Sequence, residues 1–351
     1  MIGDEFSPDG ASLDIDAQAL ARHLSGKLPG LDGALRVRQF AGGQSNPTYL
    51  LAHGGQRWVL RKKPPGRLLP TAHMVDREYR IFSSLAGSEV PVPRTYLFCS
   101  DPSVIGTEFF VMEYVQGRIF WNASLPEIAH ADERAAIYGE MNRVLAALHC
   151  VDYAACGLAD YGKPGNYFAR QIKRWSQQYD AARTGELPSM DHLIEWLPAR
   201  VPDDDETRLV HGDFRLDNMI FHPTEARVLA VLDWELSTLG HPLADLAYNC
   251  MPYHGPFRGA PQLSDVAGDR SGIPTEQSYV QQYCDRAGRV KIPRWNFYLA
   301  FSFFRYASIV QGVHHRGLQG NASSADDAPE MRARAVAAAE TGWRLACVGS
   351  E

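Results

Sequence analysis

The sequence lacks a long uninterrupted apolar run, and it lacks an excess of positive charge. Its longest apolar stretch, residues 297–310, is interrupted by Arg305 and is shorter than the roughly 20 residues that a helix needs to cross a bilayer. The 35 lysines and arginines are outnumbered by 41 aspartates and glutamates, and the formal net charge is -6. We therefore expect no membrane and no nucleic-acid partner, and we expect residues 297–310 to form a buried core helix.

Paired cysteines and a secretory signal are missing as well. The six cysteines form no C-x-x-C pair and stand mostly in apolar or helical surroundings, which favours buried free thiols over a metal or redox site. The acidic start, MIGDEFSPDGAS, has no apolar run of the signal-peptide type. These absences predict a cytoplasmic protein. The 351 residues, 45% hydrophobic and 22% charged, are typical of a globular chain with a sizeable core.

The sequence pattern changes near Gly117. Before it, short runs of β-forming residues are separated by glycine and proline pairs, which predicts a three-stranded antiparallel meander, a helix ending at Gly87 and two further strands. A short helix capped by Asp14 or Asp16 precedes them. After Gly117, apolar residues recur every three or four positions, as in helices.

We therefore predict an α+β chain with two lobes. Residues 1–116 are expected to form a small antiparallel-sheet lobe that carries one helix, and residues 117–351 a mostly helical lobe. Residues 255–275, rich in glycine, serine, aspartate and proline, are expected to be a loop or a lid.

Oxygen-bearing side chains gather in residues 209–235. Residues 219–221 and 228–232 are expected to pair as a hairpin, which sets Asn218 opposite about residue 232 and next to Asp233. An amide oxygen and a carboxylate so placed suit Mg²⁺, which completes its shell with waters and substrate phosphates. Asp213, in the preceding loop, would face the same end and could accept or orient the proton of a hydroxyl nucleophile.

The spacing H-x-D-x-x-x-x-N, followed by strand, turn, strand and Asp, is the arrangement of kinase-like phosphotransferases. The residues HGDFRLDN and LDWE resemble the aminoglycoside phosphotransferase and choline kinase family. VLRKKPPGRLLPTAH, DREYRIF and the run from HGDFRLDN to LGHPLADLAY look like the kinase-like domain fused to some acyl-CoA dehydrogenases. The resemblance implies a bilobal protein-kinase-like fold that binds ATP and Mg²⁺ and phosphorylates a small-molecule hydroxyl acceptor.

The resemblance also implies nucleotide-binding residues. Arg61 matches the strand cation that contacts phosphates, with Lys62 as the alternative, and Glu78 matches the helix glutamate that pairs with this cation. Gly42, Gly43 and Ser45 match the loop that covers the nucleotide, although a plain hairpin turn is the alternative. Glu113 and Val115 match the hinge whose backbone bonds an adenine edge.

Other residues of the same region receive roles from the resemblance. Arg215 matches a cation that contacts the transferring phosphoryl group, with a surface arginine as the alternative. Asp245 resembles a buried aspartate that bonds the catalytic loop, and His211 is expected to support that loop's backbone. Glu235 stays undecided between the metal and the substrate, and Asp217 is expected to be a turn residue.

The identity of the acceptor is left open. The family acts on aminoglycosides, choline, homoserine and sugars, whereas the dehydrogenase-fused domain implies a hydroxylated acyl-CoA or a related acid. Basic and aromatic residues after position 250 favour an anionic acceptor: Arg258, Arg270, Lys291, Arg294, Arg305, His314, His315 and Arg316, with Tyr253, Trp295 and Phe304. A silent pseudokinase and a Mg²⁺-dependent phosphohydrolase are the alternatives from other classes.

Overall fold

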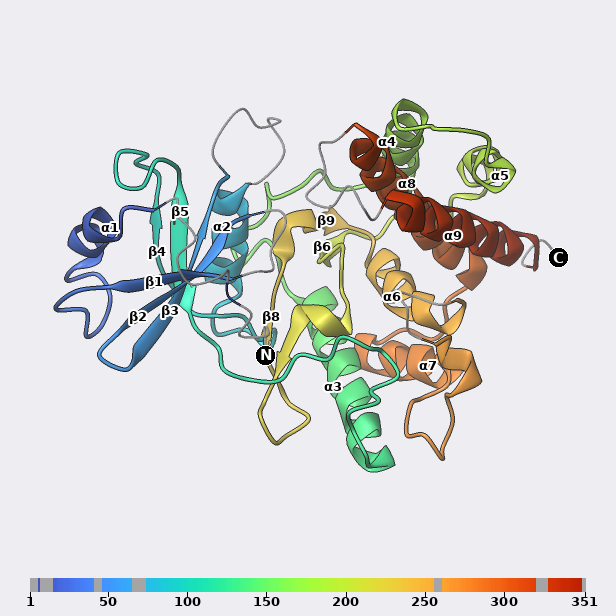
Figure 1. The fold of residues 1–351 in the computed structure, drawn as a ribbon. Helices are drawn as coiled ribbons and strands as arrows, with labels where there is room; N and C mark the ends of the chain where they lie inside the picture. The colour runs from blue at the N-terminus through green and yellow to red at the C-terminus, as the bar shows by residue number, and fades with distance from the viewer. Residues whose placement is uncertain are drawn as a thin grey trace. The chain divides into compact units, whose positions relative to one another are not determined.

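The computed structural model describes Phe6 and residues 15–40, 46–64, 74–255, 261–319 and 328–348 (Figure 1). Gly42, Gly43 and Ser45, the expected nucleotide-covering loop, and Arg258 lie outside the described residues. The chain divides into two compact units. The first unit is Met1–Phe120 with Asp217–Leu236, and the second is Trp121–Leu216 with Ser237–Glu351.

The first unit contains a five-stranded antiparallel sheet with the order β1-β2-β3-β5-β4. Its strands are β1 (Arg36–Gln39), β2 (Thr48–His53), β3 (Gln56–Lys62), β4 (Thr95–Cys99) and β5 (Phe109–Glu113). The predicted meander is therefore confirmed, and so is the α+β class of the chain.

A helix packs on each face of this sheet. Alternation along β5 places Phe109 and Val111 in one core cluster with Leu20 of α1 (Ala17–Leu24). Phe110 points to the opposite face, where its ring lies 6.0 Å from that of Phe82 in α2 (Val75–Leu85). Asp16 caps α1 by accepting from the N–H groups of residues 18 and 19. Figure 1 shows the two helices on either side of the strands.

The hairpin β7 (Met219–Phe221) and β8 (Val228–Val231) belongs to the first unit. The N–H of Leu232 donates to the carbonyl of Asn218 at 2.8 Å, so the expected opposition of positions 218 and 232 is confirmed. The lobes predicted from the sequence differ from the two units here, because residues 217–236 group with the sheet and not with the helices that flank them in the chain. The lobe division at residue 117 stays a prediction.

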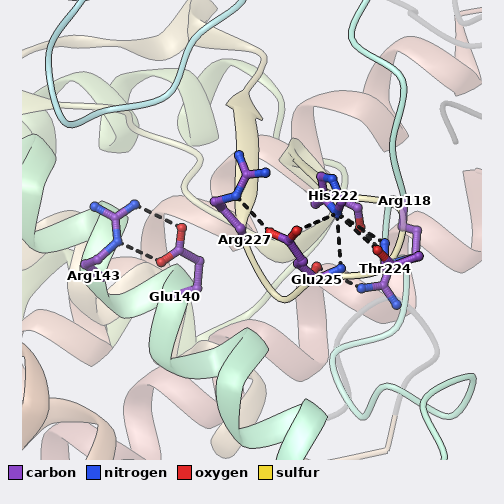
Figure 2. Close-up of polar contacts among 7 residues, drawn as sticks. All are labelled: Arg118, Glu140, Arg143, His222, Thr224, Glu225 and Arg227. Atoms are coloured by element: carbon purple, nitrogen blue, oxygen red, sulfur yellow. Dashed lines mark hydrogen bonds and ion pairs between the residues drawn. The ribbon is translucent and has the colours of Figure 1, made fainter.

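Arg118 ties this hairpin to the chain that leaves the sheet. Its backbone exchanges two hydrogen bonds of 2.8 Å with Phe221. Its side chain donates to the carbonyls of His222 and Glu225 at 3.0 and 2.9 Å (Figure 2). The imidazole of His222 in turn accepts from the N–H groups of Thr224 and Glu225. The turn is thus fixed by its own polar groups and by Arg118.

The second unit is mainly helical, with one two-stranded sheet of β6 (Arg208–Val210) and β9 (Thr238–Gly240). Its α-helices are α3 (Ala131–Cys150), α4 (Tyr167–Ala181), α5 (Pro188–Trp196), α6 (Pro242–Cys250), α7 (Glu276–Ala287), α8 (Trp295–Leu318) and α9 (Ala328–Val348). Helix α8 packs against α4, α6 and α9, and α3 packs against α7. The predicted helix 297–310 is confirmed as the buried part of α8. Figure 2 includes the ion pair of Glu140 and Arg143 on α3.

The cysteines are free thiols, as predicted, but the prediction that they are buried is correct for only part of them. All six cysteines are free, and Cys99, Cys250 and Cys284 are buried as expected. Cys150 and Cys347 are exposed, because each stands in the last turn of its helix, and Cys156 is half-buried. No helix among the described residues is long and apolar enough to span a membrane.

Gly117 allows the close approach of the hairpin. A Cβ atom at this position would lie 2.1 Å from the carbonyl oxygen of Phe221 and 2.5 Å from a methyl of Ile220. We expect Gly117→Ala to destabilise the protein by about 1–3 kcal/mol, as overpacking does. Gly139→Ala is the matched control, since this glycine lies inside α3 with open space around it and should stabilise by roughly 0.5–1 kcal/mol. Thermal unfolding of both variants checks the opposite signs.

Candidate functional site

Arg61 and Glu78 form a buried ion pair in the first unit. Arg61 Nη1, from β3, donates to Glu78 Oε1 of α2 at 2.7 Å, and Glu78 is only 1% exposed. Lys62, the alternative cation, is buried, and its backbone N–H bonds the carbonyl of Pro47. The pairing therefore favours Arg61 as the cation that Glu78 holds in place. Its contact with phosphate stays a prediction.

The turn after β8 brings further charge to this pair. The backbone N–H of Trp234 hydrogen-bonds the Glu78 carboxylate, and the Trp234 indole anchors the turn by donating to Val231 O at 3.0 Å. Asp233 has a left-handed backbone with φ 64°, a conformation that aspartate tolerates better than most residues. Such outliers often mark functional positions.

Glu78 is affected by both neighbouring acids. Burial raises its pKa most, Arg61 lowers it, and the charges of Asp233 and Glu235 raise it again, so that the pKa is about 7. Within the part of the chain that the structure describes, the buried oxygen Oε2 of Glu78 has no hydrogen-bond partner. The carboxylates of Asp233 and Glu235 therefore act on the buried ion pair of Glu78 and Arg61 in the first unit.

This charge and these oxygen ligands fit a divalent cation of the Mg²⁺ type. Asn218 and Asp233 are the ligands expected from the sequence, and the backbone pairing of residues 218 and 232 brings them to one end of the hairpin. No group of three or more His, Cys, Asp or Glu side chains in the described residues forms a metal site alone. In proteins Mg²⁺ usually keeps several waters and takes further ligands from substrate phosphates.

The expected hinge lies where β5 ends. Glu113 is the last residue of β5; its N–H donates to Arg94 O at 2.8 Å, and its side chain accepts from the N–H of Arg94. Val115 is half-buried against a cluster of Ile119, Ile220 and Ala230. The segment that follows the sheet thus packs on the hairpin that carries Asn218 and Asp233. Adenine binding by this segment stays a prediction.

In the second unit, hydrogen bonds to a residue of α6 fix the backbone of the loop that carries Asp213. The N–H groups of His211 and Gly212 donate to the two oxygens of Asp245 at 2.6 and 2.8 Å. The N–H of Asp213 donates to His211 Nδ1 at 3.1 Å. The structural roles expected for Asp245 and His211 are therefore confirmed.

The carboxylate of Asp213 is paired within its own unit. Arg215 Nε lies 2.8 Å from one oxygen, and Nη2 donates to the other at 2.9 Å. Tyr248 also hydrogen-bonds the carboxylate. Burial alone would raise the pKa of Asp213, but Arg215, Tyr248 and His211 outweigh it and lower the pKa. Asp213 is therefore an ionised hydrogen-bond acceptor. The structure shows the Arg215 guanidinium in this pairing with Asp213.

Tyr248, Asn249 and Arg305 contact this loop or its residues, and the sequence did not predict this role for any of them. Tyr248 and Asn249 follow Asp245 by three and four positions, so α6 presents all three on one face. Asn249 donates to Phe214 O at 3.1 Å, and Arg305 of α8 donates to Gly212 O at 2.6 Å. Two features of the sequence could have indicated these residues: the spacing of the polar residues within PLADLAYNC and the presence of an arginine inside an apolar helix.

Burial removes part of the basic and aromatic set proposed for the acceptor. Arg305, His314, Tyr253 and Phe304 are buried, because they face the helix packing of the second unit. The cations of that set that stay exposed are Arg270, Lys291, Arg294 and Arg316. The tail is therefore not one basic and aromatic surface.

The pKa of Glu78 predicts how stability changes with pH. Between its ordinary value of 4.5 and about 7, the folded protein binds more protons at this site than the unfolded chain, so this group makes stability fall as the pH rises. Relative to Glu78→Gln, the wild type should lose up to roughly 3 kcal/mol between pH 5 and pH 8. Denaturant unfolding of both proteins across this range measures the difference, and parallel curves would contradict the shift. Glu108→Gln is the control, since Glu108 pairs with Lys63 at the half-exposed surface.

Comparison with known proteins shows which proteins this chain is similar to. Acyl-CoA dehydrogenase family member 11 of Gallus gallus is 50% identical over 340 residues, which are 94% of this chain and 43% of that protein. The chain spans 31–43% of the length of its curated relatives. A structure from Ralstonia eutropha, named as a candidate aminoglycoside phosphotransferase, is 50% identical with a TM-score of 0.85 and covers 95% of this chain and 99% of its own.

More distant structures share the fold. A thermostable mutant of aminoglycoside phosphotransferase APH(4)-Ia, in ternary complex with AMP-PNP and hygromycin B, matches with a TM-score of 0.60 at 16% identity. That match covers 93% of this chain and 99% of the other. Residues 36–279 of this chain match the model of the phosphotransferase enzyme family. This chain, with its kinase-like fold, therefore belongs to the phosphotransferase enzyme family.

Proposed function

We propose that this protein transfers the γ-phosphoryl group of ATP to a hydroxyl group of a small molecule, and that the acceptor is a hydroxyacyl-CoA or a related acid. The observation that carries the proposal is the position of Glu78. This buried carboxylate joins the strand cation Arg61 to the turn that bears Asp233. A phosphohydrolase would not need that link, whereas a kinase needs cation, carboxylate and metal ligand in fixed relation.

On the donor side, each residue has a separate task. Arg61, held by Glu78, neutralises phosphate charge, and the backbone around Glu113 and Val115 receives the adenine. Gly42, Gly43 and Ser45 cover the phosphates. Asn218 and Asp233 would hold Mg²⁺, which when bound supplies charge neutralisation of the phosphates. Since the transition state of phosphoryl transfer is loose, this positioning and neutralisation supply most of the rate.

On the acceptor side, Asp213 accepts the hydrogen bond of the attacking hydroxyl. Arg215 pairs with both oxygens of this carboxylate and would also stabilise negative charge on the transferred group. The acid is kept ionised by its partners, so it orients the hydroxyl and receives the proton once the new bond has formed.

An acyl-CoA acceptor is supported by the relatives and by charge. The chain is about half identical to a region of proteins named as acyl-CoA dehydrogenase family members. The exposed Arg270, Lys291, Arg294 and Arg316 offer cations for an anionic substrate. Aminoglycosides and amino alcohols are the second class of acceptor, because related folds carry the name aminoglycoside phosphotransferase.

Replacing Asp213 should remove transfer and spare nucleotide binding. We expect Asp213→Asn to lower kcat by about 10²–10⁴-fold, while the affinity for ATP stays within a few-fold. Asp217→Asn, in the same loop, is the control and should keep activity. The assay follows label from γ-labelled ATP into a panel of hydroxyacyl-CoA thioesters, aminoglycosides and amino alcohols. Label found only as inorganic phosphate would indicate hydrolysis and contradict the proposal.

Replacing Asp233 should affect the metal-dependent part of binding. Asparagine tolerates the left-handed backbone, so Asp233→Asn should fold. We expect Mg²⁺-dependent nucleotide affinity to fall by about 10- to 100-fold, with little change in the affinity measured without Mg²⁺. Calorimetric titration with a non-hydrolysable ATP analogue in both conditions measures this. Glu225→Gln is the control, because Glu225 is an exposed acid paired with Arg227 in the turn of the same hairpin, and it should leave both affinities unchanged. An equal loss with and without Mg²⁺ in Asp233→Asn would show that Asp233 is not a metal ligand.

A further inference from the structure

Arg305 is a buried charge in the middle of an apolar helix. It is 4% exposed within α8, between Phe304 and Tyr306. A charge in such a place costs several kcal/mol unless its surroundings compensate it. Among the described residues, its guanidinium makes no ion pair with a carboxylate. Its compensation must therefore come from other groups.

Two kinds of group surround this guanidinium. Its Nη2 donates to the carbonyl of Gly212 at 2.6 Å. Its carbon atom Cζ lies 5.7 Å from the ring centre of Trp175 and 5.5 Å from that of Tyr248, which is the range of cation–π attraction. Arg305 thus contacts the peptide directly before Asp213 and also the ring of a residue that bonds Asp213.

Tyr248 completes the connection. It is 6% exposed, and its hydroxyl hydrogen-bonds the carboxylate of Asp213. Burial, and then the charge of Asp213, raise the pKa of Tyr248 far above its ordinary value. The phenol therefore stays protonated, so that in this bond it is the donor and Asp213 the acceptor.

We propose that Arg305 and Tyr248 together form a brace that positions Asp213 for phosphoryl transfer. Arg305 fixes the Gly212 carbonyl and the ring of Tyr248, and the hydroxyl of Tyr248 fixes the carboxylate. Both act through Asp213 and are positioning residues. This inference rests on the proposed function, and it removes Arg305 from the cations that contact the acceptor.

Among the described residues, the charged and titratable groups that act on Asp213 include Arg215 and His211 from its own loop and Tyr248 from α6, with Arg305 beside the Tyr248 ring. Removing the donor hydroxyl destabilises the charged form of the acid, so the pKa of Asp213 must rise. Tyr248→Phe does this while keeping the ring over Arg305.

The first measurement needs no substrate. In protein carrying ¹³C at the aspartate carboxyl, the Asp213 signal is assigned by its absence in Asp213→Asn and followed against pH. We expect its midpoint to rise by about one pH unit in Tyr248→Phe. Tyr138→Phe is the matched control, since this buried hydroxyl donates to Ala123 O at 2.6 Å, and it should leave the midpoint unchanged. An unchanged midpoint in Tyr248→Phe overturns the brace.

The second measurement is kinetic. We expect Tyr248→Phe to lower kcat about tenfold and to move the acid limb of its pH profile upward, with the KM for ATP within twofold. Arg305→Lys keeps a charge but loses the planar donor, so it should lower kcat at least as much. Arg332→Lys is its control, because Arg332 donates in the same way to the carbonyl of Glu186.

The double variant separates a shared brace from two independent effects. Since both side chains act on Asp213, Tyr248→Phe with Arg305→Lys should lose less activity than the product of the two single losses. Full multiplicativity overturns the coupling. If the wild type transfers phosphate to no acceptor in the panel, the proposed function fails, and the carboxyl titration still decides the brace.

Discussion

The N–H groups of His211 and Gly212 donate to the two oxygens of Asp245, and the shape of the Asp213 loop depends on this pair of bonds. Gly212 adopts φ 82°, a conformation that glycine reaches without the steric cost of a side chain. Because both amides are buried, losing the carboxylate would leave two unsatisfied donors. Tyr248 and Asn249 reach the same loop only because they share one face of α6 with Asp245.

Two buried carboxylates of this protein have opposite net pKa shifts, although burial by itself raises the pKa of both. Asp245 and Glu78 are each 1% exposed. Burial raises the pKa of Asp245, but His149 and His211 outweigh it, so the net pKa is lowered. For Glu78 burial is the largest influence and raises the pKa; Arg61 and the amide of Trp234 lower it, and the charges of two nearby acids raise it further, so that the pKa is about 7. The first carboxylate is a fixed structural anchor, whereas the second lies near two further acids whose charges raise its pKa, and a divalent cation nearby would favour its charged form.

Local sequence signals predicted several contacts that the structure shows. The register of residues 218 and 232 followed from the length of one turn, and Asp245 and Glu78 followed from motif positions, since each depends on short spacings or a single helix face. Tyr248 and Arg305 could not be predicted in this way. Arg305 is 93 residues from Gly212 in the chain, and only the packing of α6 against α8 brings them together. The same packing buried His314 and Phe304, which composition alone had suggested as substrate contacts.

The pairing of Asp213 affects how this residue would act on a hydroxyl group in the proposed reaction. A general base works best when its pKa lies near the working pH, but Arg215 and Tyr248 lower the pKa of Asp213. A carboxylate with a lowered pKa is a weak base, so early removal of a proton from an alcohol by Asp213 would be strongly unfavourable in free energy. In a loose transition state the attacking oxygen forms little bond before the phosphoryl group has left its donor, so the proton need not move early. An ionised, braced Asp213 therefore suits orientation of the hydroxyl first and proton transfer last.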